Sequence, residues 1–268
     1  MNSSIKVRVR RLLAPVARIV VGTPLEGPAY SVWNVVTRGS RPTGAVEYDE
    51  LTMSVMQRVL SHDSNGIDVG AHRGTILRSL VDLAPDGRHY AVEPLPVFAN
   101  GLRRRFPRVE VLELALSDQQ GEATFHHIVT NPSYSGLSFR DYPNQGEVIE
   151  DIAVKVERLD AVIPDDLPIQ FLKIDVEGGE LGVLRGSRSL LRRWHPVVVF
   201  EHGWNDAKAQ PADAPSEAIW NELSSSGLGV YELEAWLAGG DALSLAEFLD
   251  HLGQGTYYFL AAPQSLSG

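Results

Sequence analysis

Short apolar runs alternate with stretches of helical periodicity from residue 66 onward. This alternation is typical of a parallel β-sheet that is covered by helices. The apolar runs predict strands over residues 66–69, 89–92, 109–114, 171–174 and 197–200. Helices are predicted between them, over residues 74–83, 97–106 and 180–194. The last of these places Leu181, Leu184 and Leu191 on one face, as expected of a helix that packs on a sheet.

The remaining segments predict additions to this α/β core. Two extended segments, 121–129 and 152–156, flank a loop at 131–144 that is rich in turn-forming residues and is either a lid or a disordered connection. Helices at 216–225 and 244–252 precede extended segments at 228–233 and 256–260, and these last two strands can pair antiparallel. We predict one domain over 61–268 and an N-terminal helical appendage over 1–60, with a helix at 51–60.

Composition narrows the possible chemistry and partners. The chain has 268 residues and no cysteine, which excludes disulfides, thiolate nucleophiles and cysteine metal sites and fits a reducing cytoplasm. Its formal charge of −10 argues against nucleic acid as the main partner. Every apolar run is shorter than the roughly 20 residues of a membrane-spanning helix. The basic, amphipathic start either packs on its own domain or rests on a membrane surface or partner subunit, so a homodimer is compatible with the sequence.

A glycine turn between the first predicted strand and helix indicates a cofactor pocket. Gly70 and Gly74 permit positive φ and close approach of a ligand, and Asp68 lies two residues before the first glycine. The third glycine of a dinucleotide fingerprint is missing, so a sulfonium amino acid fits this turn better than a pyrophosphate. Glu93 ends the second strand, where an acid can accept hydrogen bonds from ribose hydroxyls of either NAD or S-adenosylmethionine.

Five segments resemble the FkbM-type methyltransferases: IDVGAHRG, YAVEP, ALSDQQGEATF, FLKIDVEGGELGVLRG and VVVFEHG. The resemblance covers residues 66–203 and implies a Rossmann-like class I fold, with a mostly parallel sheet of seven strands whose last strand is antiparallel. It implies S-adenosyl-L-methionine as cofactor and methylation of an oxygen of a sugar or natural product, with a methylmannose polysaccharide as one specific acceptor. The cofactor-binding residues that we predict are Asp68, Gly70, Ala71, His72, Gly74, Glu93, Pro94, Ser117, Asp118 and Asp175.

Acidic residues follow two predicted strands and suggest how a hydroxyl is activated. Asp175 follows the strand at 171–174, while Glu201 and His202 follow the strand at 197–200. If these strands are neighbours, the three side chains converge, an arrangement that resembles catechol-type O-methyltransferases, where acids hold magnesium. We therefore expect Asp175, Glu201 and His202 to be catalytic and to bind Mg or Mn. The competing hypothesis has no metal and makes His202 the general base, held by Glu201 or Asp175.

The acceptor side is predicted from aromatic and polar residues near these strand ends. The candidates for substrate contact are Tyr134, Ser135, Tyr142, Glu177 and Trp204. Glu177 has a second interpretation, as a cap of the helix that starts near residue 178.

The leading hypothesis is an O-methyltransferase that acts on a small-molecule or oligosaccharide acceptor. The alternatives are an NAD-linked oxidoreductase and a non-catalytic cofactor-binding protein. The sequence argues against the oxidoreductase because it has neither the third glycine of the dinucleotide fingerprint nor a Tyr-x-x-x-Lys pair. The acids after two strands argue against the non-catalytic alternative.

Overall fold

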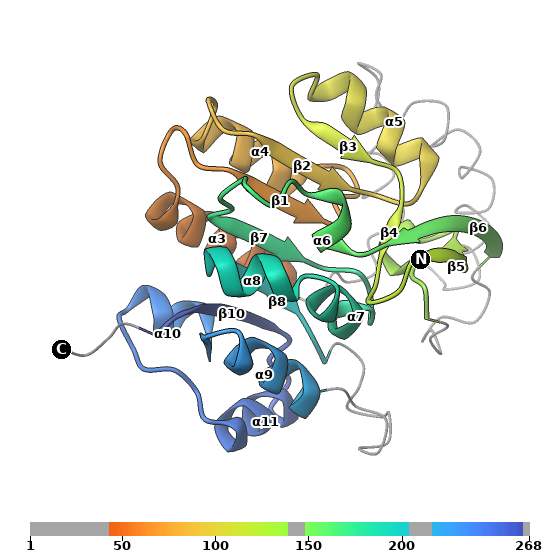
Figure 1. Ribbon diagram of the computed structural model, residues 1–268. Helices are drawn as coiled ribbons and strands as arrows, with labels where there is room; N and C mark the ends of the chain where they lie inside the picture. Colours follow the sequence, from red (N-terminus) through yellow and green to blue (C-terminus); the bar gives the residue numbers. More distant parts are fainter. Residues whose placement is uncertain (1–42, 139–147, 204–215, 265–268) are drawn as a thin grey trace.

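The computed structural model describes residues 43–138, 148–203 and 216–264, and its centre is a seven-stranded sheet in the order β3-β2-β1-β7-β8-β10-β9 (Figure 1). The strands are β1 (Gly66–Val69), β2 (His89–Val92), β3 (Glu110–Leu112), β7 (Phe171–Ile174), β8 (Val197–Glu201), β9 (Leu228–Tyr231) and β10 (Tyr258–Pro263). The first five pair in parallel, and β10 runs antiparallel to both β8 and β9. The expectation of a mostly parallel, Rossmann-like sheet with an antiparallel last strand is confirmed.

Helices cover both faces of this sheet. On one face lie α6 (Leu159–Val162), α7 (Glu180–Arg185), α8 (Arg188–Trp194), α9 (Ser216–Ser225) and α11 (Leu245–Gly253) (Figure 1). On the other lie α3 (Thr43–Val59), α4 (Thr75–Leu83), α5 (Pro96–Arg105) and α10 (Leu233–Leu237). Because both faces are covered, the central strands are fully buried, which explains why they are apolar apart from Asp68 and Lys173. Val55 and Met56 of α3 are buried in the same core as α4.

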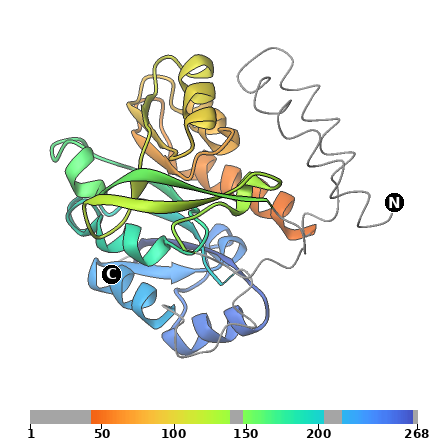
Figure 2. The same cartoon turned by 90° about the vertical axis from the view of Figure 1, so that its right-hand side faces the viewer.

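A second sheet holds the extended segments that the sequence adds after β3. It contains β4 (Ala115–Leu116), β6 (Ile149–Glu157) and β5 (Gly121–Ile128), in that order. Strands β5 and β6 pair antiparallel over their length and lie across the edge at which the parallel strands end (Figure 2). Phe125 and Val154 pack against Leu95 and Phe98 at the start of α5. The second sheet is thus anchored beside the end of β2.

The predicted helix over 180–194 is in fact two helices, α7 and α8. A Cβ atom at Gly186 would lie 2.2 Å from the carbonyl oxygen of Ser117, so this position accepts only glycine. The glycine lets the residue that follows β4 approach the junction between α7 and α8. The next residue, Ser187, is buried and donates its hydroxyl to the Val183 carbonyl oxygen at 2.5 Å. A serine that bonds to the preceding turn in this way competes with the regular helix.

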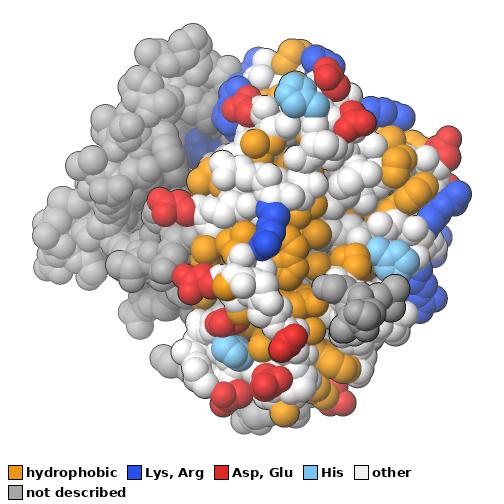
Figure 3. All heavy atoms as spheres, turned by 90° about the vertical axis from the view of Figure 1, so that its left-hand side faces the viewer, with side chains coloured by type: hydrophobic (Ala, Val, Ile, Leu, Met, Phe, Trp, Pro, Cys, Tyr) orange, Lys and Arg blue, Asp and Glu red, His pale blue; other side chains and the backbone are white. Residues whose placement is uncertain are grey.

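The surface that faces left in Figure 1 carries both acidic and basic side chains, interspersed around an area of hydrophobic ones (Figure 3). Among the helices that the structure describes, none is both long and apolar enough to cross a membrane.

Candidate functional site

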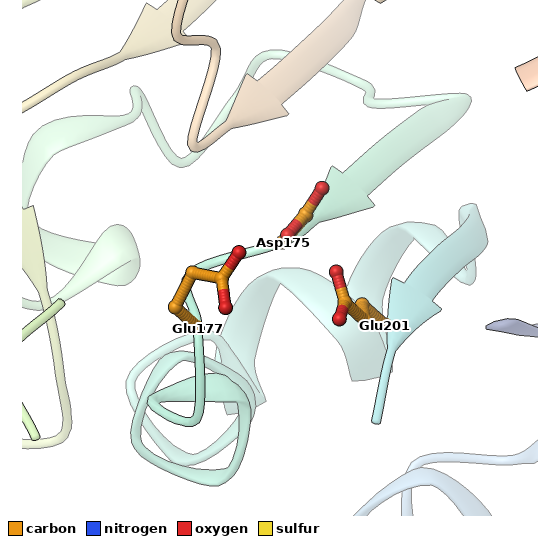
Figure 4. A group of neighbouring side chains, drawn as sticks. All are labelled: Asp175, Glu177 and Glu201. Atoms are coloured by element: carbon orange, nitrogen blue, oxygen red, sulfur yellow. The ribbon is translucent and has the colours of Figure 1, made fainter. Parts of the chain in front are cut away.

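Three carboxylates gather where β7 and β8 end. Asp175 follows β7, Glu201 ends the neighbouring strand β8, and Glu177 lies in the loop between β7 and α7 (Figure 4). One carboxylate oxygen from each residue lies within 4.8 Å of the others, a spacing that one metal ion can bridge. We call Asp175, Glu177 and Glu201 the acidic group. The strand neighbours that the sequence analysis required are present, and they bring Asp175 and Glu201 together.

Glu177 reaches this group through an unusual backbone conformation. Its φ of +56° is in the left-handed region, which costs about 1 kcal/mol or more for a residue with a side chain. The amides that precede α7 are satisfied by Glu180, whose Oε1 accepts hydrogen bonds from Val176 N at 3.3 Å and Gly178 N at 2.9 Å. Glu180 therefore fills the capping role that was one interpretation of Glu177. The Glu177 carboxylate faces Asp175 and Glu201 instead (Figure 4).

His202 does not join the acidic group, and this corrects its prediction as a metal ligand beside Asp175 and Glu201. Its ring is buried, with Nε2 2.8 Å from the Ser216 hydroxyl and the ring stacked on Phe248. Consecutive residues of an extended chain point to opposite sides, so Glu201 and His202 cannot both face the end of β7. Among the described residues, Glu177 takes the place that we predicted for His202.

A buried lysine that the sequence analysis missed sits beneath Asp175. Lys173 Nζ lies 3.2 Å from Asp175 Oδ2 and 3.6 Å from Asp68 Oδ1, and it donates a hydrogen bond to the Gly70 carbonyl oxygen at 3.2 Å. Burial alone would lower the pKa of Lys173, but the charges of Asp175 and Asp68 outweigh it and raise the pKa. Lys173 stays charged and ties β7 to the turn after β1. The available signal was a lysine within the apolar run FLKI.

The carboxyl groups of Asp175 and Glu201 differ in protonation. Burial raises the pKa of Glu201 well above its usual range, and the negative charges of Asp175 and Glu177 add to this rise. Burial also acts to raise the pKa of Asp175, but the Lys173 charge and hydrogen bonds from Glu201 and Tyr258 lower it. Tyr258 donates its hydroxyl to Asp175 Oδ2 at 2.8 Å. Without a metal, Glu201 therefore takes up a proton more readily than Asp175 does.

The glycine turn after β1 has the predicted positive φ values, +76° at Gly70 and +74° at Gly74. A Cβ atom at Gly70 would lie 1.8 Å from the Asp175 carbonyl oxygen, so this glycine lets the turn approach the end of β7. At Gly74 it would meet the side chains of Leu102 and Phe106, which shows that α4 packs closely against α5. Asp68 below this turn is 1% exposed, and burial raises its pKa despite the nearby Lys173 charge.

Two buried carboxylates keep unused acceptor capacity, as a bound cofactor would require. Among the described residues, Asp68 Oδ1 accepts no hydrogen bond. Glu93 accepts one hydrogen bond at each oxygen, from His72 N at 2.8 Å and Leu95 N at 2.9 Å. A carboxylate oxygen can accept a second bond, so Glu93 can also receive ribose hydroxyls. These residues fit the ammonium and ribose ends of S-adenosylmethionine, with Ala71, His72 and Pro94 beside them along the chain.

Burial raises the pKa of Glu93 to about 7, which predicts a pH dependence of stability. A carboxyl whose pKa rises on folding binds its proton more tightly in the native state. Its contribution therefore lowers the free energy of unfolding as pH rises from about 4.5 to about 7, by up to about 3 kcal/mol. The change Glu93→Gln should remove this loss, so the variant gains stability relative to the parent between pH 5 and 8. Urea unfolding of both proteins at these two pH values measures the difference, and equal losses in both would contradict the assignment.

The other predicted residues lie in different surroundings. Ser117 packs against Gly182 of α7, and Asp118 lines a hollow with arginines such as Arg158 and Arg188, so their place near an adenine ring stays a prediction. Ser135 is buried and accepts a hydrogen bond from Ile128 N at 3.0 Å, which ties the loop to β5. Tyr134 belongs to the 3-10 helix η1 (Pro132–Tyr134). Tyr142 and Trp204 lie outside the described residues.

The loop at 131–144, predicted as either a lid or a disordered connection, approaches the acidic group in its described part. A Cβ atom at Gly136 would lie 3.2 Å from the carbonyl oxygen of Glu177 and 3.4 Å from its Cβ. Gly136 also forms a β-bridge with His126 of β5. The second sheet thus holds residues 131–138 against the chain segment that carries Glu177.

Comparison with known proteins decides the family. A family model described as the methyltransferase FkbM domain matches residues 68–230, which include the glycine turn, Glu93 and the acidic group. The chain belongs to the FkbM methyltransferase family. It therefore carries an FkbM-type methyltransferase domain, and the resemblance noted in the sequence is confirmed.

Individual relatives of this FkbM-family methyltransferase differ in size. The 2-O-methyltransferase NoeI of Sinorhizobium fredii is 22% identical over 205 residues, which cover 69% of this chain and 80% of NoeI. The AMB antimetabolite synthetase AmbE of Pseudomonas aeruginosa is 31% identical over 200 residues, which cover 60% of this chain but 9% of AmbE. A crystal structure of an FkbM methyltransferase from Methylobacillus flagellatus superposes with a TM-score of 0.47 at 17% identity, over 95% of this chain and 59% of that one.

Proposed function

We propose that this methyltransferase transfers the methyl group of S-adenosylmethionine to a hydroxyl of a sugar or glycosylated metabolite, with a divalent metal at the acidic group. The observation that carries the proposal is the meeting of Asp175, Glu177 and Glu201 at the strand edge that also carries the cofactor residues. The name of NoeI, a 2-O-methyltransferase, agrees with transfer to oxygen.

The residues at this edge divide the task between them. Asp68, the glycine turn and Glu93 would hold the cofactor, whose sulfonium supplies an electrophilic methyl carbon. Transfer is an in-line displacement, so the acceptor oxygen must lie about 3 Å from that carbon, on the side opposite sulfur. An alcohol is a poor nucleophile until its proton leaves, and the acidic group can assist this step in either of two ways.

In the favoured way, the three carboxylates would hold Mg or Mn, and the ion would supply a positive charge that lowers the pKa of the acceptor hydroxyl. Lys173 and Tyr258 engage Oδ2 of Asp175 and so fix the orientation of that carboxylate. In the second way there is no metal, and the Asp175–Glu201 pair itself accepts the hydroxyl proton.

Metal removal distinguishes the metal-assisted route from the metal-free route. After dialysis against EDTA, methyl transfer to a glycoside should fall at least about a hundredfold and return with added Mg²⁺ or Mn²⁺. The change Glu177→Gln should weaken Mn²⁺ binding, followed by electron paramagnetic resonance, by about tenfold or more. His202→Gln, outside the acidic group, is the matched control and should keep the parent's Mn²⁺ affinity. Full activity in the metal-free enzyme would exclude the metal and assign the base role to the Asp175–Glu201 pair.

A further inference from the structure

Three tyrosine rings form a continuous aromatic cluster beside the acidic group, and we call Tyr48, Tyr257 and Tyr258 the tyrosine wall. The Tyr48 ring stacks on that of Tyr258, with centroids 5.1 Å apart and an angle of 19°. Tyr257 meets both of the other rings edge-on, at centroid distances of 4.9 Å and 5.7 Å. All three residues are half-buried, so they do not belong to the closed core of the protein.

Several contacts place this wall at the reaction site. Tyr258 lies opposite Glu201 in the β8–β10 pairing and donates its hydroxyl to Asp175. His202, the residue after Glu201, donates its backbone N–H to the Tyr257 carbonyl oxygen at 2.7 Å, which holds Tyr257 beside the end of β8. The wall therefore borders the acidic group at Asp175 and at the end of β8.

The wall comes from chain segments outside the FkbM match. Tyr48 belongs to α3, while Tyr257 and Tyr258 belong to the segment that enters β10, whereas the family model covers residues 68–230. The cofactor residues and the three carboxylates all lie inside that range. The residues proposed to bind the methyl donor and the metal thus lie in the FkbM domain. The segments that flank this domain supply an aromatic surface next to it.

We propose that Tyr48 and Tyr257 bind the acceptor, with the apolar face of a pyranose ring against their rings and one hydroxyl at the acidic group. Tyrosine suits this role because its ring offers an apolar surface while its hydroxyl bonds to sugar oxygens. Tyr258 is a positioning residue, which fixes the Asp175 carboxylate and the Tyr48 ring. This inference rests on the proposed function, since it requires a sugar acceptor.

Kinetics with simple acceptors test the inference. Methyl transfer from labelled S-adenosylmethionine is measured to the methyl α-pyranosides of mannose, glucose and galactose, with the open-chain polyol mannitol as control. We expect transfer to a pyranoside and not to mannitol. Tyr48→Leu and Tyr257→Leu, which keep much of the packing volume, should raise KM about tenfold and change kcat little. Tyr48→Phe, which keeps the ring, should raise KM less than Tyr48→Leu, and Tyr258→Phe should lower kcat instead of raising KM.

The outcomes distinguish this inference from the proposed function. Affinity for S-adenosylhomocysteine, measured by calorimetry on every variant, should equal that of the parent and shows that a variant is folded. If the Leu variants bind S-adenosylhomocysteine and keep the parent KM for a pyranoside, the tyrosine wall is not the acceptor site, although sugar methylation stands. If S-adenosylhomocysteine binds but no pyranoside is methylated by the parent protein, the sugar acceptor and the wall's role both fail.

Discussion

Asp175→Asn should reduce kcat for methyl transfer by about a thousandfold and leave S-adenosylhomocysteine binding nearly intact. The substitution preserves shape but removes the negative charge of Asp175, whose pKa the Lys173 charge lowers although burial acts to raise it. Its loss removes one ligand of the proposed metal and one carboxylate of the proposed Asp175–Glu201 base. Both proposed routes to a deprotonated hydroxyl therefore fail. The magnitude matches the loss of a group that stabilises charge in the transition state.

The control for this prediction is Asp166→Asn, the same change at an exposed loop position before β7. This variant should retain the parent's kcat, because Asp166 lies outside the site. Rapid-quench measurement of single turnovers, with cofactor affinity by calorimetry, separates chemistry from binding. If Asp175→Asn kept more than a tenth of the parent's single-turnover rate, the acidic group would not carry the chemistry.

Lys173→Met should destabilise the fold by about 3–5 kcal/mol, a large part of the stability of a typical domain. The lysine is buried between Asp68 and Asp175, so its removal leaves two carboxylates without their cation. The lost hydrogen bond to the Gly70 carbonyl oxygen adds to the cost. Urea unfolding monitored by circular dichroism measures the change in the free energy of unfolding.

Two further variants make the Lys173 prediction specific. Lys155→Met, the same change at a lysine with 64% of its side chain exposed, should alter stability by no more than about 1 kcal/mol. Adding Asp68→Asn to Lys173→Met removes one of the stranded charges, so the double variant should be more stable than the sum of the single effects. Strictly additive effects would show that the Lys173–Asp68 ion pair contributes nothing to folding.

The sequence predicts the central sheet well because its signal is local. Strands β1, β2 and β7 begin and end at the predicted residues, since a strand buried on both faces is mostly apolar and is followed here by glycine or an acidic residue. The break between α7 and α8 could not be predicted in the same way. It depends on the approach of Ser117 to Gly186, two residues that are far apart in the chain.

The sequence predicts the site in outline, and the errors of that prediction have physical causes. Asp175 and Glu201 converge as expected because adjacent parallel strands end at one edge. His202 follows Glu201 directly in the sequence. Because side chains alternate along a strand, the sequence alone already argues against both of them joining one site. Lys173 was missed because a charge in an apolar run is explained only by its distant partner Asp68. The tyrosine wall depends on how α3 and β10 pack against each other, which no local pattern reveals.

The account depends on a divalent cation bound by the acidic group next to the cofactor's reactive end. The most direct measurement is anomalous X-ray scattering from crystals grown with S-adenosylhomocysteine and Mn²⁺. We predict one manganese peak among Asp175, Glu177 and Glu201, with the cofactor product along Asp68, the glycine turn and Glu93. Cofactor product bound elsewhere, or manganese absent from these three carboxylates at saturating concentration, would contradict the account.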